Sequence, residues 1–89
     1  MDSCGVYVIQ RRDTGDSYIG SSYRVNARWY AHKRALRLGI HHSPRLQATW
    51  NKHGEEAFTL RVLEECPRET LLEREQEYLT AFRPVSTRA

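Results

Sequence analysis

The sequence predicts an α/β (α+β) layer fold in the order ββααβα, with an antiparallel hairpin joined by a third strand and covered by helices. Three observations predict it. Two short apolar runs flank a turn-forming segment near the N-terminus, a third run alternates near residue 60, and three segments have helical periodicity. The 89 residues are enough for one small domain and not for two cores, so a single domain over residues 1–89 is expected.

The strands are indicated by β-branched and alternating residues. Gly5 to Gln10 and Ser17 to Ser21 are strand-like, and the segment between them contains Asp13-Thr14-Gly15-Asp16, which favours a tight turn. Phe58 to Leu63 alternates between apolar and polar residues. These runs predict a hairpin and one further strand.

Helical periodicity and end signals predict three helices. The predicted helices run from Val25 to Leu38, from Pro44 to His53 and from Glu69 to Phe82. Gly39 and Gly54 end the first two, and Ser43 is the expected N-cap of the second. Ser22 and Asn26 are both candidates for capping the first. Residues 83–89 are expected to form a flexible tail after the last helix.

Glu75 interrupts the apolar face of the last predicted helix. With Leu71 at 0°, Tyr78 falls at about 340° and Glu75 at about 40°, for 3.6 residues per turn. Leu72 and Leu79 extend the same stripe. An ionised carboxylate on such a face is costly unless it is paired or bound to a cation. A salt bridge and a catalytic or metal-binding role both remain open.

The first helix also carries polar residues near its apolar stripe. Arg28 and His32 are four residues apart and share one face; His32 falls inside the stripe with Val25, and Arg28 at its edge. A packed histidine and a snorkelling arginine are one interpretation. The other is a polar site, in which both face the same core as Tyr7, Tyr18 and Glu75.

Composition narrows the function classes. The formal net charge is +3 and the pI about 9.1, which suits a polyanionic partner. Four basic residues on other helix faces, expected to be exposed, are candidates for DNA contact: Lys33, Arg34, Arg37 and Arg45. No apolar run approaches the ~18 residues of a membrane span and no signal peptide is evident, so a cytoplasmic, non-secreted protein is expected. Phosphate-loop, zinc-protease and serine-nucleophile motifs are absent.

Two triplets carry a family resemblance. Gly5-Val6-Tyr7 followed by Tyr18-Ile19-Gly20 is similar to the motif of GIY-YIG nucleases. Arg28-Trp29, His32, His41, the stretch Leu46-Gln47 through Asn51-Lys52-His53-Gly54, and the acidic Glu73-Arg74-Glu75 match further positions of the family. Over residues 3–82 the sequence most resembles the catalytic domains of phage and group I intron homing endonucleases, whose site of action would be the host cytoplasm.

The resemblance implies a three-stranded antiparallel sheet and a cleft that holds the site residues. Those residues are Tyr7, Tyr18, Arg28, His32, His41 and Glu75. It implies hydrolysis of DNA phosphodiesters to 5′-phosphate and 3′-hydroxyl ends, with one Mg²⁺ or Mn²⁺ per active site at Glu75. Tyr7 is expected to activate water. His32, bonded to Tyr18, is expected to orient Tyr7 or to relay its proton.

The resemblance leaves open how DNA is recognised and to which functional class the protein belongs. Homing endonucleases usually continue into a DNA-recognition domain, and no segment of residues 1–89 suits that role. Two arrangements are open: a catalytic domain whose C-terminal DNA-recognition domain is missing or separate, and a free-standing small nuclease. Family members usually carry an asparagine after the acidic helix, and residues 83–89 contain none. A structure-specific repair-type nuclease and a non-catalytic nucleic-acid-binding module are the two alternatives.

Overall fold

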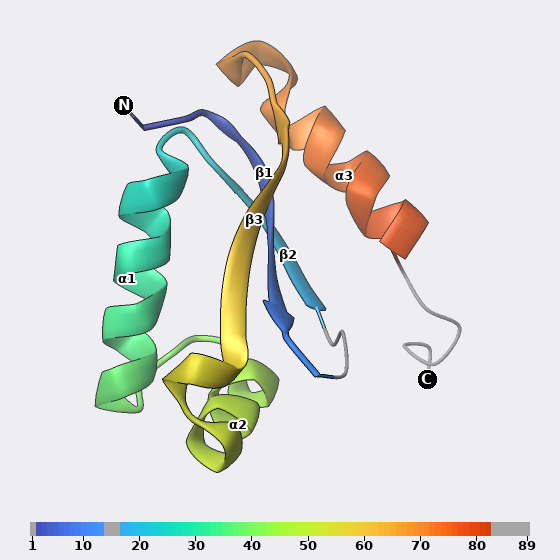
Figure 1. Ribbon diagram of the computed structural model, residues 1–89. Helices are drawn as coiled ribbons and strands as arrows, with labels where there is room; N and C mark the ends of the chain where they lie inside the picture. The colour runs from blue at the N-terminus through green and yellow to red at the C-terminus, as the bar shows by residue number, and fades with distance from the viewer. Residues whose placement is uncertain (1, 14–16, 83–89) are drawn as a thin grey trace.

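The computed structural model describes residues 2–13 and 17–82. The elements along the chain are β1 (Gly5–Arg11), β2 (Ser17–Ser22), α1 (Val25–Leu38), α2 (Pro44–His53), η1 (Glu55–Ala57), β3 (Phe58–Glu65), η2 (Arg68–Thr70) and α3 (Leu71–Phe82). This order confirms the predicted ββααβα arrangement, with two short 3₁₀ turns added (Figure 1). Most of the predicted hairpin turn and the predicted tail, residues 14–16 and 83–89, lie outside the described residues.

The three strands form one antiparallel sheet in the order β2-β1-β3. The central strand β1 pairs with both neighbours, and a bulge between Val6 and Tyr7 shifts its register against β3. Bulges increase the local twist and re-aim the side chains beside them. The predicted antiparallel sheet is confirmed, and its middle strand carries Tyr7.

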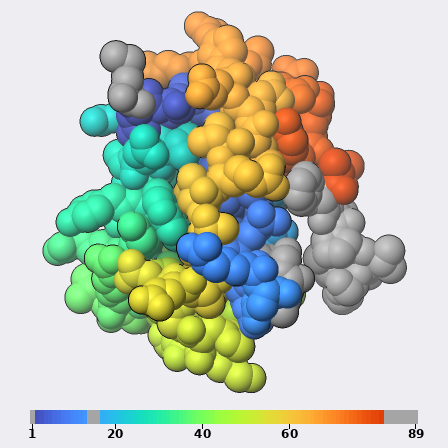
Figure 2. Space-filling model, viewed as in Figure 1, coloured from blue at the N-terminus to red at the C-terminus, as the bar shows by residue number. Residues whose placement is uncertain are grey.

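Helices cover the two faces of the sheet differently. Tyr7 and Ile9 of β1 join one core cluster with residues of α1 and α2, namely Val25, Leu36, Leu46 and Trp50, together with Phe58 of β3. Val6 and Val8 alternate to the opposite face, where α3 packs on β1 and β2. Figure 1 shows the sheet between α1 and α3, and Figure 2 shows β3 running across the surface between these two helices.

The helix ends explain why local signals predict α2 well. The hydroxyl of Ser43 accepts a hydrogen bond from the Leu46 N–H at 3.3 Å, and Pro44 occupies the first turn. Gly39 ends α1 with φ of 78°, in the left-handed region. Both predicted ends are confirmed.

The N-terminus of α1 is capped by neither predicted residue. The carboxylate of Asp2 accepts hydrogen bonds from the backbone N–H groups of Asn26 (2.6 Å) and Ala27 (3.0 Å). Burial acts to raise the pKa of Asp2, but these bonds, with a further one from the Ser3 N–H and the charge of Arg24, lower it on balance. A carboxylate from the chain's first residues therefore satisfies the start of the helix that carries Arg28 and His32.

The apolar face of α3 is narrower than the sequence predicts. Leu71 is buried, but Leu72 is 76% exposed and Leu79 is 37% exposed. The expectation that all three lie on one buried stripe is wrong, because Leu72 and Leu79, about 80–100° around the helix from Leu71, lie outside the face that packs on the sheet. Within the described residues, no helix is long and apolar enough to cross a membrane.

Candidate active site

The glycines of the two triplets are required by close packing. Gly20 lies opposite Tyr7 in the β1–β2 register, and a Cβ on Gly20 would lie 2.4 Å from Tyr7 Oη. A Cβ on Gly5 would lie 2.2 Å from the carbonyl oxygen of Glu64 in β3. Only glycine lets the Tyr7 ring cross β2 and lets β1 pair with β3 at this point.

The same register places the two tyrosines on one face. Tyr18 lies two residues before Gly20 on β2, so its side chain leaves the sheet on the side of Tyr7, as a diagonal neighbour. Tyr7 is 1% exposed and Tyr18 is half-buried. This face is the one covered by α1, which supplies the histidine between them.

A chain of hydrogen bonds runs inward from Tyr7. Its hydroxyl lies 2.7 Å from His32 Nε2, and His32 Nδ1 lies 2.7 Å from His41 Nε2. The backbone N–H of Ser43 donates to His41 Nδ1 at 3.0 Å. His32 is 2% exposed and His41 is 8% exposed, so the chain is shielded from water along its length.

The backbone group at the end of this chain fixes the direction of every bond. An N–H can only donate, so Nδ1 of a neutral His41 is an acceptor and its proton is on Nε2. That proton is donated to His32 Nδ1, which places the His32 proton on Nε2, facing Tyr7. The Tyr7 oxygen therefore accepts a hydrogen bond, which leaves its own O–H free to point into the site.

Burial sets the protonation of these groups. It lowers the pKa of His32 to about 4, with further lowering by Arg28, His41 and His42. Burial, then His42, lowers the pKa of His41 as well. Burial raises the pKa of Tyr7 to about 12, against the opposing effect of Arg28. At neutral pH both histidines are uncharged and Tyr7 holds its proton.

Tyr18 has a different partner from the expected one. The expectation that His32 is bonded to Tyr18 is wrong: the hydroxyl of Tyr18 lies 2.8 Å from His42 Nε2, and Tyr18 meets the His32 ring only edge-on, at 5.7 Å between centroids. Helix geometry directs His32 to the central strand, and the loop after α1 brings His42 to the edge strand. Residue-level reasoning missed His42, and its only sequence signal is its position beside His41.

Arg28 is exposed on α1 beside the tyrosines. Burial raises the pKa of Tyr7 and Tyr18, and the charge of Arg28 opposes this effect. Burial lowers the pKa of His32, and the charge of Arg28 lowers it further. A guanidinium at such a position can bind a phosphate oxygen through two N–H groups. The structure thus brings Arg28, His32 and both tyrosines together.

Glu75 approaches from the other face of the sheet. It lies on α3, half-buried, and its Oε1 accepts a hydrogen bond from Ser21 of β2 at 2.6 Å. The expectation that Glu75 shares one core with His32 is wrong, because α1 and α3 lie on opposite faces. Its charge still contributes to raising the pKa of Tyr7 and Tyr18, after the larger effect of burial. Ser21, which the sequence did not single out, holds this carboxylate at the edge of β2.

A carboxylate in this setting suits a hard divalent cation. Ser21 uses one lone pair of Oε1, and the remaining oxygen positions of Glu75 are hard ligands of the kind that Mg²⁺ takes together with waters and a substrate phosphate. Among residues 2–13 and 17–82, no group of three or more His, Cys, Asp or Glu side chains is arranged to hold a metal ion. Glu75 thus fits a site with one protein ligand and does not fit a closed protein cage.

The four basic residues predicted to contact DNA are not equivalent. Arg34 and Arg45 are exposed. Arg37 forms a two-pronged salt bridge with Glu55, at 2.6 and 2.9 Å. The expectation that Lys33 is exposed is wrong, because it is half-buried with Nζ 5.2 Å from the centre of the Trp29 ring. DNA contact by this set stays a prediction.

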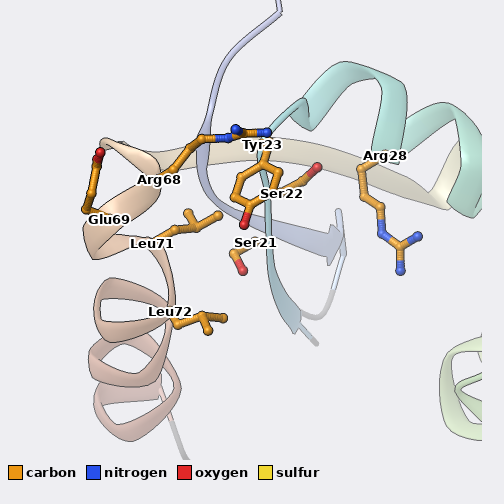
Figure 3. Close-up of a pocket in the computed structure, with 8 residues that line it drawn as sticks. All are labelled: Ser21, Ser22, Tyr23, Arg28, Arg68, Glu69, Leu71 and Leu72. Atoms are coloured by element: carbon orange, nitrogen blue, oxygen red, sulfur yellow. The ribbon is translucent and has the colours of Figure 1, made fainter.

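A pocket of about 400 Å³ adjoins the site on its α3 side (Figure 3). Its lining residues come from the end of β2, from the connection after it, from α1, and from η2 with the start of α3: Ser21, Ser22, Tyr23, Arg28, Arg68, Glu69, Leu71 and Leu72. Ser21 and Arg28 belong to both the pocket and the site. The pocket is therefore continuous with the polar groups around Tyr7.

Comparison with known proteins places this arrangement in a family. The GIY-YIG catalytic domain matches residues 3–88. The chain is 35% identical over 77 residues to intron-associated endonuclease 1 of Enterobacteria phage T4. This match covers 84% of the chain and 31% of that relative. The chain thus spans about a third of the length of the curated relative it matches.

Two solved structures of the catalytic domain of intron endonuclease I-TevI have the same fold. A mutant form superimposes with a TM-score of 0.85 at 33% identity, over 93% of this chain and 86% of that one. The other gives a TM-score of 0.84 at 32% identity, over 90% and 88% of the two chains. The chain therefore belongs to the GIY-YIG catalytic domain family and is an endonuclease domain.

Proposed function

We propose that this domain hydrolyses DNA phosphodiester bonds with Mg²⁺ or Mn²⁺ held at Glu75. The observation that carries the proposal is the Tyr7–His32–His41 chain, which holds a tyrosine oxygen beside Arg28 with its proton directed into the site. The similarity of the sequence to an intron-associated endonuclease further supports a homing-type catalytic domain. We propose that DNA recognition belongs to a separate segment or partner, since the domain matches only part of that relative.

The proposed reaction is an in-line displacement by water. Tyr7, as the phenolate, takes a proton from the attacking water, and the His32 N–H stabilises that phenolate. The water oxygen bonds to phosphorus, the bond to the 3′-oxygen breaks, and that oxygen takes a proton from solvent water. The proton now on Tyr7 is released to solvent, which restores the phenolate. The products are a 5′-phosphate and a 3′-hydroxyl.

The cationic groups would balance the negative charge of the scissile phosphate. Arg28 donates to a non-bridging oxygen of the scissile phosphate. Bound at Glu75, Mg²⁺ would supply Lewis-acid stabilisation of the charge that develops on the phosphate and the leaving oxygen. Tyr18, held by His42, would place its hydroxyl beside the same phosphate.

Supercoiled-plasmid nicking at low salt tests the proposal. The parent should nick DNA with Mg²⁺ or Mn²⁺ and not with EDTA, leaving ends that DNA ligase reseals. Glu75→Gln and Tyr7→Phe should each lower the rate by at least ~10²-fold. Glu73→Gln, on an exposed position of the same helix, is the matched control and should nick as the parent does.

The same assay separates the alternatives. Nicking that survives in Glu75→Gln would remove Glu75 from its proposed role. Absence of nicking with DNA binding retained would favour a non-catalytic binding module. Preference for branched over linear DNA would favour a structure-specific repair-type nuclease over a homing-type domain.

A further inference from the structure

The pocket beside the site is built around a stacked pair of planar groups. The guanidinium of Arg68, on η2, lies over the ring of Tyr23 with Cζ 4.0 Å from the ring centre. Tyr23 is 53% exposed, so the pair is accessible to a ligand. In Figure 3 the Arg68 side chain extends from η2 across the chain toward Tyr23, while the Glu69 carboxylate points away from the other lining groups.

The wall opposite Arg28 is apolar and exposed. Leu72, at the start of α3, lines the pocket and is 76% exposed, whereas the preceding residue, Leu71, is buried. Figure 3 shows Leu71 of α3 beside the Tyr23 ring and Leu72 further along the same helix. Apolar and aromatic walls with two guanidinium groups suit a flat, partly apolar ligand attached to an anion.

We propose that this pocket binds one unstacked nucleobase of the cleaved DNA strand, next to the phosphate at Arg28. The proposal rests on the proposed function and adds a base-binding subsite to it. Ser21 and Arg28 belong to both the pocket and the site, so a group in the pocket adjoins the reacting phosphate. The base would stack on the Tyr23–Arg68 pair and contact Leu72, whatever its identity, because every base has a π-face.

Binding to two single strands of equal charge tests this subsite. One probe is oligothymidylate of about ten nucleotides, and the other has the same sugar–phosphate backbone with abasic tetrahydrofuran units throughout. Fluorescence anisotropy in EDTA at fixed low salt gives Kd without requiring cleavage. The parent should bind the thymidylate about tenfold more tightly than the abasic strand, a difference typical of one stacked base.

Variants of Tyr23 assign that difference to the pocket. Tyr23→Ala should weaken thymidylate binding about tenfold and leave abasic-strand binding unchanged, and Arg68→Ala should weaken thymidylate binding more than abasic-strand binding. Tyr23→Phe, which keeps the ring, should bind as the parent does. Tyr30→Ala, which removes a 62% exposed tyrosine of α1 outside the pocket, is the control for general surface effects and should also bind as the parent does.

Two results would overturn the subsite: equal thymidylate affinity in Tyr23→Ala and Tyr30→Ala, or an equal loss on both probes. Plasmid nicking separates this failure from failure of the proposed function. Nicking by the parent with unchanged binding in Tyr23→Ala would remove the subsite and keep the nuclease reaction. A base-dependent affinity lost in Tyr23→Ala, without nicking by the parent, would keep the subsite as a nucleic-acid contact and remove the reaction.

Discussion

The ring of Tyr7 crosses β2 directly over Gly20. A Cβ on residue 20 would lie 2.4 Å from Tyr7 Oη and 2.6 Å from its Cζ, well inside van der Waals contact. Tyr7 is 1% exposed and hydrogen-bonded to His32, so its ring cannot move aside without leaving that bond. The glycine of one triplet thus fixes the position of the tyrosine of the other.

Gly20→Ala should separate the position of Tyr7 from its chemistry. The added methyl displaces the ring, which should lower the nicking rate by at least ~10²-fold and the free energy of unfolding by about 1–3 kcal/mol, as overpacking does. Gly39→Ala is the control: its φ of 78° also costs stability, but the added Cβ would meet no described residue within 4 Å beyond its own stretch of chain. Rates measured at a temperature where both variants are folded should fall only for Gly20→Ala. A rate within tenfold of the parent would show that Tyr7 Oη needs no fixed position.

Ser21→Ala tests how Glu75 is held. Loss of the 2.6 Å hydrogen bond frees the carboxylate to rotate, so the Mg²⁺ concentration that gives half-maximal nicking should rise about tenfold, with the maximal rate less affected. A Mg²⁺ titration of the nicking rate measures both quantities. Ser17→Ala, at the exposed start of the same strand, should titrate as the parent does. An unchanged Mg²⁺ requirement in Ser21→Ala would mean that Ser21 does not orient the metal ligand.

Local sequence signals predict the elements of this fold because their causes are local. The second helix begins and ends where predicted, since its cap and its C-terminal glycine act within a few residues. The hairpin strands come within about one residue of their observed ends for the same reason. The capping of α1 by Asp2 could not be found this way, because 24 residues separate Asp2 from Asn26.

The site shows the same division. Periodicity places His32 among buried residues and marks Glu75 as an unusual carboxylate, which the structure finds half-buried. Periodicity cannot tell which face of the sheet a helix covers. The prediction from periodicity therefore put Glu75 in the same core as His32. The partners of the site residues, Ser21 for Glu75 and His42 for Tyr18, depend on contacts between elements far apart in sequence.

The dependence of the rate on pH tests Tyr7 as the base. Burial raises its pKa to about 12, so between pH 6 and 9 the phenolate fraction rises about tenfold per pH unit. The single-turnover nicking rate at saturating Mg²⁺ should therefore climb over this range without a plateau. Arg28→Ala, which removes a group that lowers this pKa, should slow the reaction at every pH in the range. A plateau above pH 7 would instead indicate a base with the pKa of a histidine.

Stability should fall in mild acid because His32 is buried in its neutral form. Its folded pKa of about 4, lowered first by burial and then by Arg28, His41 and His42, lies below the 6.5 of an unperturbed histidine. Above pH 6.5 the group contributes nothing to this dependence. Below it the unfolded chain takes up a proton that the native protein excludes, so the free energy of unfolding falls by up to about 3 kcal/mol near pH 4.

Urea unfolding of the parent and His32→Gln between pH 6.5 and 5 measures this term while most carboxylates stay ionised. The free energy of unfolding of His32→Gln should fall less steeply as the pH falls, and the difference in slope corresponds to the uptake of up to one proton on unfolding. The exposed control His53→Gln should follow the parent. Imidazole proton NMR of the folded parent gives a reading that needs no variant. The His32 ring should remain neutral at pH 5, because a proton on its Nδ1 would face the Nε2–H of His41, in a chain whose direction Ser43 already fixes.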